Sequence, residues 1–347
     1  MGPPRLSSLL VLGALLACRA PEEAGAASSR PAPTYFAAGL SEAEAGDLRA
    51  AVPGLHLVVL SPAEALERAA EADGADAGLC SDEFLARATR LSWVQAQSAG
   101  VEGVLALEGL RTSERIVLTN MSGVHAPAMS EHVFAMLLSL TRQLPRFRAA
   151  QEAGVWSRDS KGMTALSGRT LLVVGLGSIG SEVARRAQAF DMRVLATSRT
   201  AKETPPYVDH LGPASELDEL LPQADVVVIA LPLTAETRGL FGAERLARLR
   251  PGAYLINVAR GAIVDGEALA AALAGGRLAG ACLDVTDPEP LPPEHPLWKL
   301  ANVVITPHVS AQAEITGARR RELLQENLRR FAAGEPLLNV VDKEAGY

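Results

Sequence analysis

The stretch "GLGSIGSEVARRAQAFDMRVLATSRT", from Gly175 to Thr200, decides the fold. The preceding "TLLVV" is typical of a buried strand, "SEVARRAQAF" of a helix and "RVLATS" of a second strand. In such a strand–helix–strand unit, a first glycine permits a tight turn and a second lets the backbone approach a pyrophosphate, roles that fall to Gly175 and Gly177. Gly180 takes the third position, which lets the helix pack closely against the strand. The stretch therefore predicts a dinucleotide-binding turn.

The two ends of this unit indicate which dinucleotide it binds. We expect the amides of Ser178 and Ile179 to face the phosphates, because the start of a helix is its positive end. In an NAD site the second strand ends near an acidic residue that binds the ribose, but here Ser198, Arg199 and Thr200 follow. Two hydroxyls and a guanidinium suit a 2′-phosphate, so we predict that NADP(H) is preferred and NAD(H) is possible. In the alternative interpretation Arg199 is solvated and either cofactor is accepted.

The rest of the chain alternates between strand-like and helix-like segments, which predicts an α/β fold with mostly parallel sheets. Before the glycine-rich turn, the segments read as strands are 55–60, 76–80, 91–100 and 115–120. A long apolar stretch from residue 130 to 154 predicts one bridging helix, capped at Ser130 or an earlier residue. Residues 313–334 predict an amphipathic helix that returns to the first domain.

Three short polar motifs each begin at or just after the end of a predicted strand. They are "NVARGAIVD" (Asn257–Asp265), "LDVTDPEPLP" (Leu283–Pro292) and "TPHVS" (Thr306–Ser310). In open α/β sheets ligands bind at this edge, so the three motifs are candidates for one site.

With the glycine-rich turn, these motifs make the chain resemble the D-isomer-specific 2-hydroxyacid dehydrogenase family, roughly from Tyr35 to Asn339. The resemblance implies two Rossmann-like or flavodoxin-like domains with parallel sheets and an active site in the cleft between them. We expect residues 34–126 plus 312–341 to form the substrate-binding domain and residues 127–311 the dinucleotide-binding Rossmann domain. It also implies a homodimer that reduces small 2-oxo acids, of the glyoxylate or hydroxypyruvate type, to D-2-hydroxy acids.

The family uses an arginine, a glutamate and a histidine as its catalytic set, and these residue types match Arg260, Glu289 and His308. The planar fork of Arg260 suits a carboxylate and polarises a ketone. Imidazole titrates near neutral pH, so His308 is the expected proton donor and acceptor. Glu289 would orient the imidazole and stabilise its charged form. Because relatives that oxidise formate carry an amide beside the histidine, Glu289 argues against that activity.

The resemblance also implies other contacts. Asp284 is expected to face the nicotinamide carboxamide, and the loop "QSAG" is expected to bind the substrate carboxylate through Ala99 and Gly100. The other implied cofactor contacts are Leu231, Pro232, Thr237, Val258, Ala259 and Arg260.

Other interpretations of the same residues stay open. Arg260 could be a surface residue, Glu289 part of an exposed turn, and His308 a structural imidazole. A corepressor-like protein of the same superfamily, which senses the cofactor without significant turnover, could keep all three side chains. Three other residues, read as packing or hinge residues, are His125, Glu131 and His132. Three histidines without a partner pattern are treated as incidental: His56, His210 and His295.

Composition narrows the range of partners. A net charge of −7 without a long basic run argues against nucleic-acid binding. The three cysteines, Cys18, Cys80 and Cys282, have neither metal-type spacing nor an obvious pairing, so no metal site or disulfide framework is predicted.

The first residues resemble an export signal. "MGPPRLSSLLVLGALLAC" has an apolar run too short to span a bilayer and ends in a lipobox-like "LLAC". We therefore favour a lipoprotein signal over residues 1–18, a lipid tether on Cys18 with the protein on the periplasmic side, and a linker over 19–33. An NADP(H) pool is expected only in the cytoplasm. In the alternative interpretation, translation therefore starts downstream of this segment and the protein is cytoplasmic.

Overall fold

The computed structural model describes residues 31–200 and 203–347. The predicted signal segment with Cys18, and residues 19–30 of the predicted linker, lie outside the described residues. Among the helices that are described, none combines the length and the apolar character needed to cross a bilayer.

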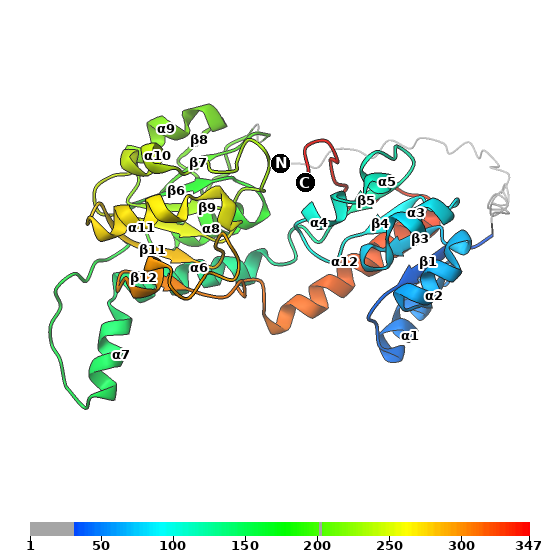
Figure 1. Ribbon diagram of the computed structural model, residues 1–347, viewed down its shortest axis with the longest axis horizontal. Helices are drawn as coiled ribbons and strands as arrows, with labels where there is room; N and C mark the ends of the chain where they lie inside the picture. Colours follow the sequence, from blue (N-terminus) through cyan, green and yellow to red (C-terminus); the bar gives the residue numbers. More distant parts are fainter. Residues whose placement is uncertain (1–30, 201–202) are drawn as a thin grey trace, which may run out of the picture. The chain divides into compact units, whose positions relative to one another are not determined.

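Within the described residues, the strands form two sheets in which every strand pairing is parallel (Figure 1). The first sheet has the strand order β2-β1-β3-β4-β5. Its strands are β1 (Thr34–Ala37), β2 (His56–Val59), β3 (Gly74–Asp76), β4 (Trp93–Gln95) and β5 (Val117–Thr119). Its helices are α1 (Glu42–Ala51), α2 (Pro62–Glu67), α3 (Asp82–Arg87), α4 (Glu102–Leu105) and α5 (Glu108–Arg111).

The second sheet has the order β12-β11-β10-β9-β6-β7-β8. Strands β7 and β8 are added on one side of β6, and the chain then crosses to the other side of β6 to add β9 to β12. Its strands are β6 (Thr170–Val174), β7 (Arg193–Thr197), β8 (His210–Gly212), β9 (Val226–Ile229), β10 (Ala253–Asn257), β11 (Leu278–Leu283) and β12 (Val303–Ile305). Its helices are α8 (Ser178–Gln188), α9 (Leu217–Leu220), α10 (Ala243–Arg248) and α11 (Gly266–Ala274). The predicted α/β class with parallel sheets is confirmed.

Both faces of the second sheet are covered. Along β9 the side chains alternate: Val227 and Ile229 belong to one buried cluster, and Val226 and Val228 to the other. The first cluster includes side chains of α9, α10 and α11, and the second those of α8 and of α6 (Ala126–Thr141). A strand buried on both faces reads as a continuous apolar run, which explains "DVVVIALP".

The predicted strand 76–80 is wrong in its bounds. The strand ends at Asp76, whose carboxylate accepts a hydrogen bond from the backbone of Ala38 at 2.7 Å. Residues 77–79 then form a single 3-10 turn, closed by a hydrogen bond from the Cys80 N–H to the Ala77 carbonyl.

The predicted single bridging helix is wrong as well. It is two helices, α6 (Ala126–Thr141) and α7 (Leu144–Glu152), separated at Gln143, whose φ of 59° lies in the left-handed region. Of the two predicted positions for the cap, Ser130 or an earlier residue, the earlier one is confirmed, because α6 begins after His125. Ser130 lies inside the helix, where its hydroxyl donates to the Pro127 carbonyl. No residue of α7 is buried.

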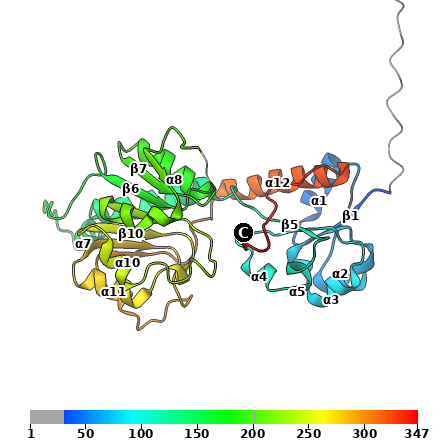
Figure 2. The ribbon, with the colours of Figure 1, turned by 90° about the horizontal axis from the view of Figure 1, so that it is seen from above.

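The last helix, α12 (Glu314–Ala333), packs on the first sheet, as the sequence predicted. Its Leu324 and Leu328 share a buried cluster with Tyr35 and Trp93. Figure 2 shows α12 beside α1, and an ion pair joins Arg321 of α12 to Glu44 of α1 at 3.3 Å. The chain thus adds its last helix to the first sheet after completing the second.

Candidate active site

The glycine-rich turn leaves both space and hydrogen-bond donors at the start of α8. Gly175 has a φ of +101°, and a Cβ on Gly180 would collide with the Gly175 carbonyl oxygen, so both positions require glycine. A Cβ on Gly177 would meet no atom within 4 Å. Within residues 31–200 and 203–347, no acceptor pairs with the N–H groups of Ser178 or Ile179. This arrangement fits the diphosphate of a dinucleotide.

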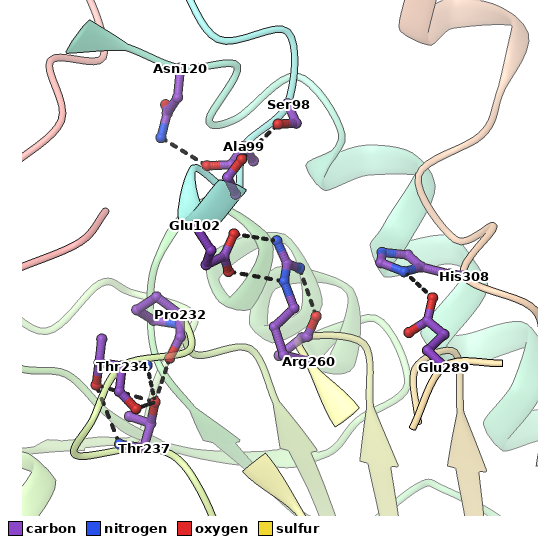
Figure 3. Close-up of polar contacts among 12 residues, drawn as sticks. Ser98, Ala99, Glu102, Asn120, Pro232, Thr234, Thr237, Arg260, Glu289 and His308 are labelled. Atoms are coloured by element: carbon purple, nitrogen blue, oxygen red, sulfur yellow. Dashed lines mark hydrogen bonds and ion pairs between the residues drawn. The ribbon is translucent and has the colours of Figure 1, made fainter. Parts of the chain in front are cut away.

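The loop after β9 lies against this turn. Leu231 Cδ2 lies 2.8 Å from the point where a Cβ on Gly175 would stand. The Thr237 hydroxyl donates to the Pro232 carbonyl at 2.7 Å and accepts from the Thr234 N–H at 2.8 Å (Figure 3). The predicted contacts Leu231, Pro232 and Thr237 therefore belong to one fixed loop beside the glycine-rich turn.

The predicted 2′-phosphate residues follow directly after β7. The Ser198 hydroxyl accepts a hydrogen bond from the Thr200 N–H at 3.3 Å. The Arg199 guanidinium carbon lies 4.7 Å from the centre of the Tyr347 ring. Tyr347 belongs to none of the sequence motifs, so its contact with Arg199 could not be predicted from the sequence.

Arg260 is presented by a tight turn after β10. The buried amide of Asn257 donates to the Arg260 carbonyl at 2.9 Å and accepts from the Ala259 N–H at 3.0 Å. The side chains of Val258 and Ala259 are buried, so only their backbone could face a cofactor. Glycine follows Arg260 because a Cβ on Gly261 would collide with the Thr286 carbonyl. The Arg260 turn therefore touches the segment that leads to Glu289.

Glu289 and His308 form the closest pair of the predicted trio. His308 Nδ1 lies 2.7 Å from Glu289 Oε1, and both side chains are nearly half exposed (Figure 3). His308 has a φ of +54°, a conformation that non-glycine residues adopt at a cost and that is concentrated at functional sites. With Nδ1 directed at the carboxylate, Nε2 is left without a partner among the described residues.

The buried carboxylate of Asp284 holds the loop that carries His308. It accepts hydrogen bonds from the Thr306 hydroxyl at 2.7 Å and from the Val309 and Ser310 N–H groups at 3.0 and 3.1 Å. Burial alone raises the pKa of Asp284, but these hydrogen bonds outweigh it and leave the pKa lowered. The His308 N–H donates to the Asp284 carbonyl at 2.8 Å. The carboxylate thus braces the loop, and its predicted contact with the nicotinamide stays a prediction.

His132, predicted to be a packing or hinge residue, supports the same loop from α6. Its Nε2 lies 2.9 Å from the Thr306 hydroxyl and 3.8 Å from Asp284 Oδ1. The Thr306 hydroxyl therefore lies between an imidazole and a carboxylate, two residues before His308.

The predicted substrate loop after β4 presents unpaired donors. The Asn120 amide donates to the Ala99 carbonyl at 2.9 Å, and the Ser98 hydroxyl donates to the Gly100 carbonyl at 2.6 Å. In the part of the chain that the structure describes, the N–H groups of Ala99 and Gly100 donate to no protein acceptor. Two adjacent unpaired N–H groups can bind a carboxylate.

A buried acid, Asp76, anchors the start of that loop and was missed at the sequence level. Its carboxylate accepts from the Gln97 amide at 2.6 Å, from the Tyr35 hydroxyl at 2.5 Å and from the Ala38 N–H. Burial raises the pKa of Asp76 to about 6. No motif marks this residue, because its three donors come from two separate segments of the chain, residues 35–38 and Gln97.

Glu102 is the second residue that the sequence interpretation missed. Its carboxylate accepts from Arg260 Nε at 3.0 Å and Nη2 at 3.4 Å, and Figure 3 shows the two side chains pointing toward each other. The guanidinium lies so close to the backbone of Gly100 that a Cβ there would displace it. Arg260, which follows β10, therefore meets the segment that follows β4.

The trio is brought into one region, although its members do not all touch. Among the described residues, no hydrogen bond or ion pair joins Arg260 to Glu289 or His308. The link between them is the close approach of Gly261 to Thr286, in the segment before Glu289.

The other histidines discussed at the sequence level, and Glu131, make contacts outside the Glu289–His308 pair. His125 is buried, and burial lowers its pKa. Glu131 pairs with Arg186 at 3.3 Å. His210 lies 2.8 Å from Glu216 and His295 lies 3.5 Å from Glu267. His56 is exposed at the start of β2.

Comparison with known proteins agrees with this geometry. The family model "D-isomer specific 2-hydroxyacid dehydrogenase, NAD binding domain" matches residues 134–310. A glyoxylate reductase of Korarchaeum cryptofilum is 37% identical over 267 residues, which are 76% of this chain and 79% of that protein.

Two solved structures have the same fold over nearly their whole length. A D-isomer specific 2-hydroxyacid dehydrogenase family protein from Aeromonas salmonicida has a TM-score of 0.77 and 37% identity, covering 90% of this chain and 99% of that one. An NADPH-dependent glyoxylate/hydroxypyruvate reductase from Sinorhizobium meliloti, solved with NADP and sulfate, has a TM-score of 0.76 and 31% identity, covering 91% and 100%. The chain therefore belongs to the D-isomer specific 2-hydroxyacid dehydrogenase family and carries that family's NAD(P)-binding domain in residues 134–310.

Proposed function

We propose that this protein reduces small 2-oxo acids of the glyoxylate or hydroxypyruvate type to D-2-hydroxy acids, with NADPH as the preferred cofactor. The observation that carries the proposal is the Glu289–His308 pair, 2.7 Å apart, beside the turn that presents Arg260. The similarity to glyoxylate reductases, at 37% identity, supports this substrate class.

His308 is suited to move the proton. Its Nδ1 faces Glu289, so Nε2 can face the oxygen of a 2-oxo acid. The carboxylate favours the charged imidazole, which is the form that donates a proton during reduction. In the oxidative direction the neutral ring accepts the proton from the hydroxyl group.

The substrate carboxylate has two sets of donors within reach of one another. Arg260 supplies a guanidinium, and Ala99 and Gly100 supply unpaired N–H groups from the adjacent loop. In the structure Glu102 occupies the guanidinium. We propose that the substrate anion competes with the Glu102 carboxylate for this cation.

The residues of the glycine-rich turn fit a bound dinucleotide. Ser178 and Ile179 would hold the diphosphate, and Ser198, Arg199 and Thr200 the 2′-phosphate of NADP(H). When bound, the nicotinamide supplies or accepts the hydride. The NADP found in the Sinorhizobium meliloti reductase supports the choice of cofactor.

We also propose that the protein forms a homodimer and uses its N-terminal signal. α7 buries no residue, and Leu144, Val155 and Trp156 near it are 52%, 58% and 89% exposed, which suits a second copy (Figure 1). A monomer in sedimentation experiments would refute the pairing.

The proposed lipid tether on Cys18 is tested by cell fractionation of the parent and of Cys18→Ala. The tether requires that only the parent is found in the membrane.

The activity is tested by following NADPH oxidation with a panel of 2-oxo acids that includes glyoxylate and hydroxypyruvate. We expect turnover with at least one of them, because the proton donor His308 and the carboxylate-binding groups of Arg260 and of the Ala99–Gly100 loop all follow directly after parallel strands. Cofactor binding without turnover across the panel would instead favour the cofactor-sensing, corepressor-like function.

Replacing Arg199 by alanine tests the cofactor preference. We expect the parent to have a higher kcat/KM with NADPH than with NADH, and Arg199→Ala to lose about tenfold or more with NADPH only, since a charged hydrogen bond to the phosphate is removed. Arg193→Ala removes the same charge from the exposed start of β7 and serves as the control. A parent enzyme that works better with NADH would contradict the preference.

Replacing Glu289 by glutamine tests the role of the pair. The amide keeps the size of the side chain but carries no negative charge to balance the imidazolium, which is the form of His308 that donates the proton. The kcat for reduction should therefore fall about tenfold or more, while the dissociation constant for NADPH stays unchanged. Glu294→Gln, which changes an exposed carboxylate in the same segment, should leave kcat unchanged. An unchanged kcat in Glu289→Gln would count against the assignment.

Replacing Glu102 by glutamine tests the competition for Arg260. The KM for the 2-oxo acid should fall about two- to fivefold, because partly exposed ion pairs are worth about 1 kcal/mol or less. Glu108→Gln, which changes an exposed carboxylate on α5, is the control. A higher KM in Glu102→Gln would mean that Glu102 positions Arg260 instead of competing for it.

A further inference from the structure

A tyrosine far from every motif lies on the predicted 2′-phosphate residue. The Arg199 guanidinium carbon is 4.7 Å from the centre of the Tyr347 ring, within the range of a cation–π interaction. Tyr347 is partly buried, whereas Arg199 is exposed. No hydrogen bond occupies the Arg199 N–H groups among the described residues. The guanidinium carbon therefore lies over the ring, and among the described residues no hydrogen bond competes for its N–H donors.

The segment that carries Tyr347 is closed on itself around Asp342. The Asp342 N–H donates to the Tyr347 carbonyl at 3.0 Å, and the Gly346 N–H donates to the Asp342 carbonyl at 2.8 Å. The Asp342 carboxylate accepts from the N–H groups of Glu344 and Ala345. Gly346, with a φ of +84°, completes this turn. These hydrogen bonds therefore fix the backbone of the turn from which the ring projects.

The same segment is anchored beside the first sheet. Val341 is buried, and its N–H donates to the Leu118 carbonyl of β5 at 2.8 Å. The Lys343 ammonium donates to the carbonyls of Leu110, Ser113 and Ile116 at 3.0, 2.7 and 2.5 Å. Partial burial lowers the pKa of Lys343. A segment held at β5 thus places an aromatic ring on a residue that follows β7 of the second sheet.

We propose that Tyr347 is a positioning residue for cofactor selection. It stacks on the Arg199 guanidinium and holds the N–H edge of this otherwise exposed side chain toward the 2′-phosphate of NADP(H). This inference rests on the proposed preference for NADP(H). A fixed guanidinium loses less conformational freedom when the phosphate binds than a free one, so the ring raises the affinity for the phosphorylated cofactor alone.

The test is a set of dissociation constants measured by calorimetry on the full chain, with no substrate present. The ligands are NADPH, NADH and the fragment pair adenosine 2′,5′-bisphosphate and adenosine 5′-monophosphate. The proteins are the parent, Tyr347→Ala, Tyr347→Phe, Arg199→Ala and the double alanine variant. We expect Tyr347→Ala to weaken NADPH and the bisphosphate about two- to fivefold, the range of an exposed cation–π contact, and to leave NADH and the monophosphate unchanged.

Two variants separate stacking from other roles of the residue. Tyr347→Phe keeps the ring and should bind NADPH like the parent. In the Arg199→Ala background the loss of Tyr347 should have no further effect, since its partner is already gone. Unchanged NADH binding in Tyr347→Ala also shows that this variant is folded.

The outcomes that would overturn the inference are distinct from those that would overturn the proposed function. Equal weakening of NADPH and NADH in Tyr347→Ala would indicate a structural role, and tighter NADPH binding would indicate that the ring obstructs the site. Either result, with selectivity still lost in Arg199→Ala, refutes only the inference. If Arg199→Ala leaves the ratio of NADPH to NADH affinity unchanged, the proposed cofactor preference itself fails.

Discussion

The site depends on one buried carboxylate, that of Asp284 at the end of β11. It binds the hydroxyl of Thr306 and two N–H groups of the following turn, so the chain reverses tightly enough to place His308 in a left-handed conformation. That conformation directs the imidazole at Glu289. An uncompensated carboxylate could not stay buried there, and a loop without it would not hold a strained histidine.

Glycines let the remaining segments approach this centre. Gly261 allows the Arg260 turn to touch the backbone of Thr286, and Gly100 allows the guanidinium to lie on the substrate loop. Gly180 allows α8 to start directly on the glycine-rich turn. At each of these three positions a Cβ would collide with neighbouring atoms. The segments can approach one another because the glycines carry no side chain. The same close packing leaves the N–H groups of the substrate loop and of α8 exposed to ligands.

Sequence predicted the parts whose signal is local. The glycine spacing after "TLLVV" fixes a strand–turn–helix. The family resemblance points to Arg260, Glu289 and His308 as the catalytic set, and their roles stay a prediction. The break at Gln143 escaped prediction because glutamine has no preference for positive φ, and Asp76 because its partners come from two segments distant from it in sequence. Glu102 and Tyr347 act on residues that are 158 and 148 positions away in sequence, and such pairs carry no pattern in a single sequence.

The central claim is that Arg260, Glu289 and His308 act on one substrate molecule. The most direct measurement is a crystal structure with NADPH and a 2-oxo acid analogue that cannot be reduced, such as oxamate. We predict that the carboxylate of the analogue binds Arg260 and the N–H groups of Ala99 and Gly100, and that its carbonyl oxygen lies against His308 Nε2. An analogue bound to ordered cofactor but touching neither Arg260 nor His308 would contradict it.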